Sequence, residues 1–182
     1  MPKKTVAVLT SEESFINNYG AALQGYALYT TLKELGLIPC IVRYKGGEAR
    51  NSQIAYRLFQ VKRFLGKKYR AIVDSKPEQY TAEVLEKVKK RERMFEDFSL
   101  SYMSFWNEKR VSWQQLRKDY PKCDCYICGS DQIWNPYFKS GFNDPGYFLA
   151  FAPVNSLKIA YAPSFGCDDI PETARRTLPA LL

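Results

Sequence analysis

Histidine is absent from this sequence of 182 residues. Because histidine is the side chain whose charge changes near neutral pH, a general acid or base here has to be another residue, and a metal site lacks its commonest ligand. Long apolar runs are absent too: no segment approaches the roughly 20 apolar residues that a bilayer-spanning helix needs. We therefore expect a protein that is not an integral membrane protein.

Motifs for nucleic-acid binding and for secretion are absent as well. The net charge is +8, but Lys and Arg are interleaved with Glu between residues 62 and 93, which is typical of a solvated helix face. No zinc finger or aromatic RNA-binding strand pair accompanies these charges, so we expect no nucleic-acid partner. The basic N-terminus has only a short apolar stretch before Ser11, Glu12 and Glu13, which favours a first β-strand over a signal peptide and predicts a cytoplasmic protein.

The five cysteines are an odd number, and without a sign of secretion we expect free thiols. Three of them form a C-x-C-x-x-C cluster at Cys123, Cys125 and Cys128, a spacing that suggests a metal site. Cys125 and Cys128 belong to a short apolar strand, however, and strand residues three apart point to opposite faces. We therefore interpret the cluster as structural and expect neither a metal nor another cofactor.

A β-α-β unit is predicted for the first 44 residues. Residues 5–9 and 37–44 are apolar strands, and the helix between them runs from about Gly20 to Leu35. Gly36 then stands where a C-cap glycine belongs. Such a unit predicts a parallel sheet flanked by helices, so the fold class is α/β and Rossmann-like. The apolar positions of this helix are Leu23, Ala27, Leu28, Leu32 and Leu35.

Shorter elements are predicted for the rest of the chain. Asp169 is placed to cap a helix that starts at Glu172. A helix at 81–98 has its apolar side chains at Val84, Leu85, Val88, Phe95 and Phe98. The other predicted elements are a loop with short helices at 45–80, a helix at 112–118, strands at 126–128 and 158–161, and a loop at 138–148.

The most informative segment is residues 125–136, with the sequence CYICGSDQIWNP. Its apolar strand ends in a glycine that lets the backbone approach a ligand, and Ser130, Asp131 and Gln132 then supply a hydroxyl, a carboxylate and an amide. Ligands of open α/β sheets bind outside the carboxyl ends of the strands. This polar set suits either sugar hydroxyls or the fixing of a catalytic loop. In the other interpretation, Ser130 and Asp131 bond only their own backbone in a turn.

Two more segments accompany it: NNYGAALQGYAL at residues 17–28 and KIAYAPSFG at residues 158–166. Together with GSDQIWNP they resemble the polysaccharide pyruvyl transferase family, in the same order along the chain from about Val6 to Gly166. The resemblance implies transfer of a pyruvyl group from phosphoenolpyruvate to sugar hydroxyls, as a ketal, in exopolysaccharide biosynthesis. It also implies two facing Rossmann-like domains in a GT-B-like architecture.

The resemblance covers only the first of these two domains. We therefore expect residues 1–170 to be the N-terminal domain, and residues 171–182 to begin a truncated helix that leads to a missing second domain. The resemblance implies that the donor-binding Arg and His lie in that second domain, so phosphoenolpyruvate needs the missing half. The chain by itself is expected to be inactive and to form the side of the cleft that binds a sugar or glycan acceptor.

Candidate acceptor-binding residues also follow the first strand, where amide side chains suit sugar hydroxyls. These candidates are Asn17, Asn18, Tyr19 and Gln24. For the two asparagines the alternative is a plain turn or N-cap role. Asp131 is the best acid–base candidate of the chain, and a loop-closing hydrogen bond is its alternative.

Trp134 and Ser164 complete the candidate site. Trp134 is either a platform on which a sugar stacks or a buried wedge that fixes the loop. Ser164 is expected to line the same cleft, and no base is available to make it a nucleophile.

Two other functions fit the same residues. The chain is alternatively a non-catalytic glycan-binding or interaction module, or half of a nucleotide-sugar glycosyltransferase, since such enzymes share the two-domain architecture. The loss of a covering domain predicts an exposed apolar face, which favours a partner chain or self-association. Residues 138–151 and 178–182 are the candidates for that face.

Overall fold

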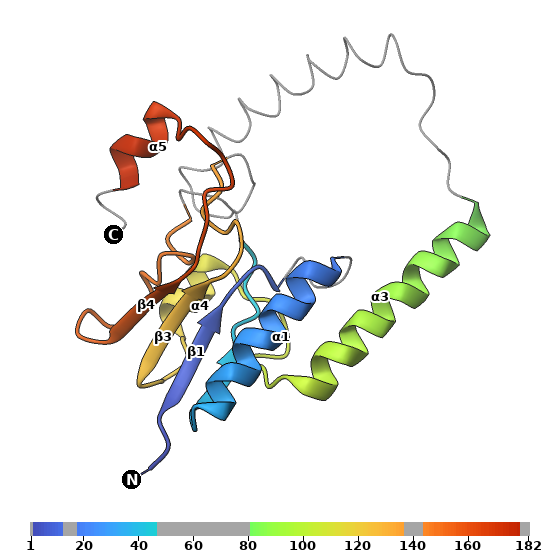
Figure 1. The fold of residues 1–182 in the computed structure, drawn as a ribbon, viewed down its shortest axis with the longest axis horizontal. Helices are drawn as coiled ribbons and strands as arrows, with labels where there is room; N and C mark the ends of the chain where they lie inside the picture. The colour runs from blue at the N-terminus through green and yellow to red at the C-terminus, as the bar shows by residue number, and fades with distance from the viewer. Residues whose placement is uncertain (1, 13–17, 47–80, 137–143, 179–182) are drawn as a thin grey trace.

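The computed structural model describes residues 2–12, 18–46, 81–136 and 144–178 (Figure 1). Within these ranges four strands form one sheet in the order β2-β1-β3-β4, and every neighbouring pair is parallel. The predicted α/β fold with a parallel sheet is therefore confirmed. The elements are β1 (Thr5–Leu9), α1 (Tyr19–Glu34), β2 (Ile38–Ile41), α3 (Ala82–Tyr102), α4 (Trp113–Lys118), β3 (Cys125–Gly129), β4 (Leu157–Tyr161) and α5 (Glu172–Thr177).

Helix α1 packs on the sheet through a face that differs from the predicted one. Leu28 and Leu32 are buried as predicted, whereas Leu23, Ala27 and Leu35 are exposed. The helix lies against the strands through small residues, which permit a closer approach than leucine side chains would. The small buried residues are Ala21, Ala22 and Gly25.

The end of α1 follows the prediction. Gly36 has a φ of 80°, which glycine adopts without steric cost. Its N–H donates to the carbonyl of Lys33 at 2.9 Å, and the N–H of Leu37 donates to the carbonyl of Leu32 at 3.0 Å. These two bonds form a Schellman motif, which turns the chain from the helix into β2.

Apolar side chains fill both faces of the sheet in two separate clusters. Val6 and Val8 of β1 lie in the cluster that α1 covers, and Ala7 and Leu9 lie in the cluster on the other face. The same alternation divides the thiols of β3, since Cys125 belongs to the first cluster and Cys128 to the second. The prediction that these two cysteines point to opposite faces is confirmed.

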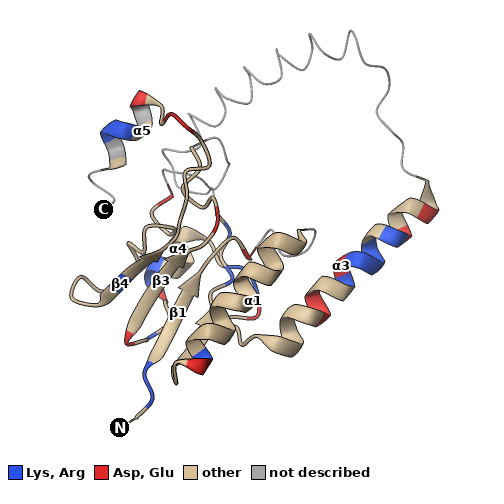
Figure 2. Ribbon diagram, in the orientation of Figure 1, with Lys and Arg blue, Asp and Glu red and all other residues tan. Residues whose placement is uncertain are grey.

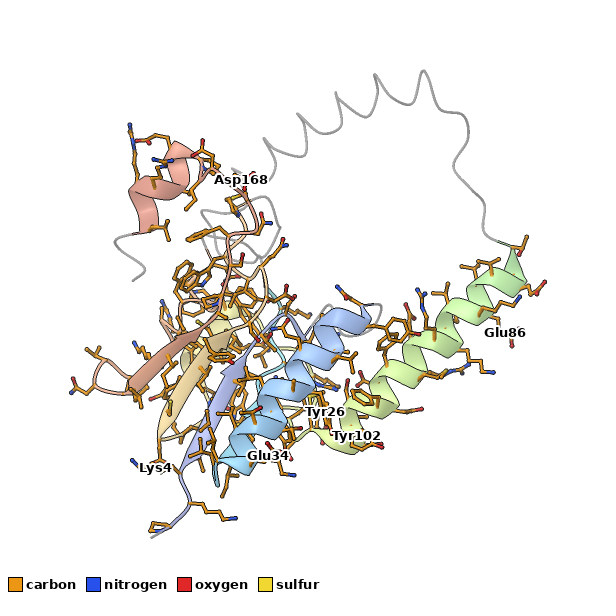
Figure 3. The ribbon with its side chains drawn as sticks, viewed as in Figure 1. Lys4, Tyr26, Glu34, Glu86, Tyr102 and Asp168 are labelled. Atoms are coloured by element: carbon orange, nitrogen blue, oxygen red, sulfur yellow. The ribbon has the colours of Figure 1, made fainter. Side chains whose placement is uncertain are left out.

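Helix α3 packs on α1 only through its C-terminal half. Figure 3 shows Tyr26 of α1 beside Tyr102 of α3, with ring centroids 5.8 Å apart. The N-terminal half projects away from the sheet (Figure 1), and Val84 and Leu85 are 37% and 48% exposed, so the predicted apolar face is wrong there. Charges of both signs lie along this half instead (Figure 2).

In the described ranges, no helix has the length and apolar character to cross a membrane.

One predicted strand end and one predicted helix cap are also wrong, although α5 starts at Glu172 as predicted. Strand β2 ends at Ile41, and Tyr44 forms only an isolated bridge with Val111, because the chain there runs beside the segment after α3. Helix α5 has Pro171 as its N-cap without a side-chain hydrogen bond, while Asp169 forms an ion pair with Arg175 at 2.6 Å. The segment predicted at 45–80 lies outside the described residues except for residues 45 and 46, and so do parts of the segments predicted at 138–148 and 172–182.

Apolar exposure occurs at a different place from the predicted one. Tyr147, Phe148 and Phe151 are at most 8% exposed. Tyr147 and Phe151 pack in the apolar cluster on the face of the sheet away from α1, and Phe148 stacks on Trp134. The described aromatic residues of the 138–151 segment therefore do not form a bare face. Exposed apolar side chains lie instead on helices α1 and α3 and on strand β4, among other described residues.

Candidate functional site

The carboxyl ends of the parallel strands lie at one edge of the sheet, where the predicted site residues follow. Gln24, in the second turn of α1, donates from Nε2 to the Oγ atom of Ser130, the residue directly after β3. Both residues are half-buried. They are 106 positions apart in the sequence, and the fold brings them into direct contact.

The segments that follow β3 and β4 are joined by backbone hydrogen bonds. The N–H of Ser130 donates to the carbonyl of Tyr161 at 2.7 Å, and the N–H of Ser164 donates to the carbonyl of Asp131 at 2.9 Å. The N–H of Trp134 donates to the carbonyl of Ser164 at 3.3 Å. Residues 129–135 and 162–166, which we call the double loop, therefore form one unit at the sheet edge.

Both halves of the double loop begin with a left-handed backbone. The φ angles are 138° at Gly129, 50° at Ser130 and 48° at Ala162. A Cβ atom at Gly129 would lie 2.0 Å from the carbonyl oxygen of Tyr161, so the strands approach this closely only with glycine. Left-handed serine and alanine each cost about 1–3 kcal/mol, and such strain occurs mainly at ligand sites.

The polar side chains of the first half bond within the loop. Oδ1 of Asp131 accepts a hydrogen bond from the N–H of Gln132 at 2.7 Å, which is the loop-closing bond of the alternative interpretation. Its second carboxylate oxygen, Oδ2, has no hydrogen bond to any other described residue. Oδ1 is therefore held by the loop, whereas Oδ2 is open to a ligand. Oε1 of Gln132 accepts from Nδ2 of Asn135 at 3.0 Å, and its side chain lies against Gly166.

Trp134 is packed inside the double loop. Its ring stacks on Phe148, with centroids 4.9 Å apart and planes at 2°, and the ring of Phe165 lies 5.7 Å away. The indole N–H donates to the carbonyl of Tyr147 at 3.1 Å. With one ring face covered and the N–H bonded, these contacts favour the wedge interpretation over a sugar platform.

The side chains of the remaining predicted residues make contacts other than the one between Gln24 and Ser130. Oδ1 of Asn18 accepts from the N–H of Ala21 at 3.2 Å, which is the N-cap role. The ring of Tyr19 packs on Phe95 of α3 at 4.7 Å and so faces the other helix. Oγ of Ser164 accepts from the N–H of Gly166 at 2.9 Å. The predicted residue Asn17 lies outside the described residues.

A charged network at the ends of β1 and β2 does not appear among the predicted site residues. Nε and Nη2 of Arg110 donate to the two carboxylate oxygens of Glu12 at 2.8 and 3.1 Å. Arg43 lies 3.6 Å from Glu12 through Nε and 2.7 Å from Glu96 through Nη2. The signal in the sequence was a charged residue three positions after the end of β1 and another two positions after the end of β2, both close to the carboxyl edge of the sheet.

Glu12 is the most deeply buried carboxylate of this network, with 2% of its side chain exposed. Burial raises its pKa above the ordinary value, and Arg110 and then Arg43 offset only part of that rise. The network links the end of β1 to the segment before α4 and to the C-terminal half of α3. It therefore fixes the edge of the sheet beside the double loop.

Comparisons with known proteins give one match. A family model described as polysaccharide pyruvyl transferase matches residues 18–181, nearly the whole chain. Neither the curated proteins nor the solved structures contained a match. The matched range includes α1, the double loop and the contact between Gln24 and Ser130.

Proposed function

Because the chain belongs to the polysaccharide pyruvyl transferase family, we propose that it forms the acceptor side of an enzyme that moves a pyruvyl group from phosphoenolpyruvate to a sugar. The observation that supports this most is the contact between Gln24 and Ser130 at the carboxyl edge of the sheet. It places an amide and a hydroxyl side by side, and this pair suits the hydroxyls of a sugar. A second, GT-B-like domain would supply the anion-binding residues for the donor.

The reaction requires two hydroxyls of one sugar to bond to the C2 carbon of phosphoenolpyruvate. Phosphate leaves from that carbon, and the two hydroxyl protons go to the methylene carbon, which becomes methyl, and to the departing phosphate. The open oxygen of Asp131 is the group in the double loop that is suited to accept a hydroxyl proton. Gln24 and Ser130 would hold the sugar, and no cofactor takes part.

Acceptor binding is tested on the chain itself by NMR titration with methyl glycosides of galactose, glucose and mannose. We expect amide shifts at Gln24 and at residues 129–132. Ser130→Ala should weaken binding about fivefold, since it removes about 1 kcal/mol of hydrogen bonding. Ser104→Ala is the matched control, because it also removes one side-chain bond, from Tyr29 at 3.0 Å, away from this edge. Shifts that avoid the double loop would contradict the proposal.

The catalytic part is tested with phosphoenolpyruvate and the glycoside that binds. Phosphate release and ketal formation are followed by a colorimetric assay and mass spectrometry, with and without the second domain of a family member added. Turnover should need that domain, and Asp131→Asn should lower it about a hundredfold. An unchanged rate in Asp131→Asn assigns Asp131 to loop closure only.

A further inference from the structure

Two cysteines that lie far apart in the sequence meet on one face of the sheet. Cys40 belongs to β2, and Cys123 stands two residues before β3. Both are half-buried, and both pack against the apolar cluster on the face away from α1. The thiol of Cys123 lies within hydrogen-bonding reach of the thiol of Cys40. The fold therefore contains a pair of neighbouring thiols that the proposed pyruvyl transfer does not use.

The strand register explains how the two thiols meet although β1 lies between β2 and β3. Cys40 is opposite Ala7 of β1, and Ala7 is opposite Tyr126 of β3. All three side chains pack in the same apolar cluster, so they share one face of the sheet. Because the side chain of Ala7 is only a methyl group, it leaves space on this face that a larger residue would fill.

The segment before β3 turns onto the same face. The backbone N–H of Cys123 donates to the hydroxyl of Tyr126 at 3.4 Å, and that hydroxyl donates to the carbonyl of Pro121 at 2.8 Å. The end of the tyrosine side chain therefore holds this segment close to Cys40. Cys125 does not take part in the contact, because it lies in the cluster on the opposite face.

We propose that Cys40 and Cys123 form a reversible disulfide bond when the protein meets a low-molecular-weight disulfide such as oxidised glutathione. The thiolate of Cys123 attacks one sulfur atom of that disulfide and displaces the first small thiolate. Cys40 then gives up its proton and attacks Sγ of Cys123, which displaces the second small thiolate. The two cysteines lose two protons and two electrons, and the small disulfide becomes two thiols.

The order of these steps follows from the surroundings of Cys40. Burial raises its pKa to about 12, and the neighbouring Cys123 adds to that rise. Cys40 therefore stays a neutral thiol near pH 8 while Cys123 reacts. The mixed disulfide has no charge on the sulfur atom of Cys123, so one cause of the raised pKa is removed before Cys40 has to ionise.

The disulfide ties β2 to the segment before β3 across β1. It closes the long loop from residue 40 to residue 123, which contains α3 and α4. Such a loop closure restricts the unfolded chain and should raise Tm by about 5–10 °C. Ser130 follows the carboxyl end of β3, whereas Cys123 precedes its amino end. Oxidation should therefore leave sugar binding at the double loop unchanged.

The first test incubates the folded chain with oxidised glutathione at pH 8 and blocks the remaining thiols with iodoacetamide. Tryptic peptides are then identified by mass spectrometry without reduction. We expect the peptide of residues 34–43, which contains Cys40, to be joined to the peptide of residues 123–139. Dithiothreitol should reverse both this linkage and the rise in Tm. A wild type in which these two peptides are not joined overturns the proposal.

Two variants assign the linkage to Cys123, because its tryptic peptide also contains Cys125 and Cys128. Cys123→Ala should abolish the linkage to the Cys40 peptide. Cys167→Ala is the matched control, since it removes another half-buried thiol and should leave the linkage unchanged. A linkage that persists in Cys123→Ala contradicts the proposed pair.

The second test separates a disulfide of the native fold from one that forms during unfolding. The rate of linkage in the wild type is measured in water and at urea concentrations below the unfolding transition. Because the two thiols already meet in the fold, we expect a rate that urea does not increase. A rate that rises steeply with urea would show that the thiols meet only in open chains, and it would overturn the proposal.

Discussion

Replacing Gly129 with alanine tests the geometry that joins β3 to the double loop. The added Cβ would lie 2.0 Å from the carbonyl oxygen of Tyr161 and 2.8 Å from its carbonyl carbon. That oxygen also accepts the N–H of Ser130, so it has little freedom to move without loss of the hydrogen bond. The φ of 138° is a second obstacle, since residues with a side chain rarely adopt it.

The two effects have separate magnitudes. The backbone conformation costs about 1–3 kcal/mol, and the steric overlap costs about 1–3 kcal/mol more. We therefore expect Gly129→Ala to lower the free energy of unfolding by about 4 kcal/mol. For a protein of this size that corresponds to a decrease in Tm of about 8–16 °C.

Gly36→Ala is the control that separates the two effects. Gly36 has a φ of 80°, but a Cβ there meets nothing within 4 Å. It should cost only about 1–2 kcal/mol. Thermal and urea unfolding followed by circular dichroism measure both variants against the wild type. If Gly129→Ala is destabilised no more than Gly36→Ala, the close approach of β3 and Tyr161 is not real.

Two further predictions concern titrating groups. Hydrogen bonds from the backbone N–H and the hydroxyl of Thr5 hold the pKa of Asp124 below its ordinary value. The ionised carboxylate therefore stabilises the fold fully above pH about 3.9, the pKa of an unfolded Asp. That contribution is lost as the pH falls through the lowered pKa of the folded state. Asp124→Asn should therefore lower the urea midpoint by more at pH 7 than at pH 3; an equal loss at both pH values would contradict this. Burial raises the pKa of Cys40 to about 12 and that of Cys128 to about 11. Iodoacetamide at pH 8 should therefore alkylate the half-exposed Cys167 well before either of these thiols, which peptide mass spectrometry would detect. Labelling of Cys40 at a rate comparable to that of Cys167 would contradict this prediction.

The strands could be predicted because each is a short apolar run between polar residues. Thr5–Leu9 agrees with the prediction at both ends, and β3 and β4 differ from it by only one or two residues. The packing face of α1 could not be predicted in the same way. Helical periodicity predicts the buried face from large apolar residues such as Leu23. In the structure, α1 packs closely on the sheet through small residues such as Ala22.

Some residues of the candidate site could be placed from the sequence and others could not. Residues that directly follow strands, such as Ser130, are placed at the sheet edge by topology alone, so the position of this residue beside Gln24 follows from the parallel sheet. The partner of Glu12 could not be found, because Arg110 lies in an irregular segment between α3 and α4 whose path no periodic pattern describes. Side-chain roles inside the loop, such as that of Trp134, depend on packing partners that the sequence does not identify.

The ion pair between Glu12 and Arg110 has a consequence for synthesis on the ribosome. Arg110 is added to the nascent chain 98 residues after Glu12. At about 5–20 residues per second, this carboxylate waits about 5–20 s for its partner. The segments of β1, α1 and β2 are complete long before then, but the cation already present beside Glu12 is Arg43, whose Nε lies 3.6 Å away without a hydrogen bond. Burial of the carboxylate is unfavourable until the hydrogen bonds from Arg110 are made. Glu12 therefore reaches its buried position only after the segment beyond α3 has emerged, and until that moment the segment after β1 is open to solvent and to chaperones.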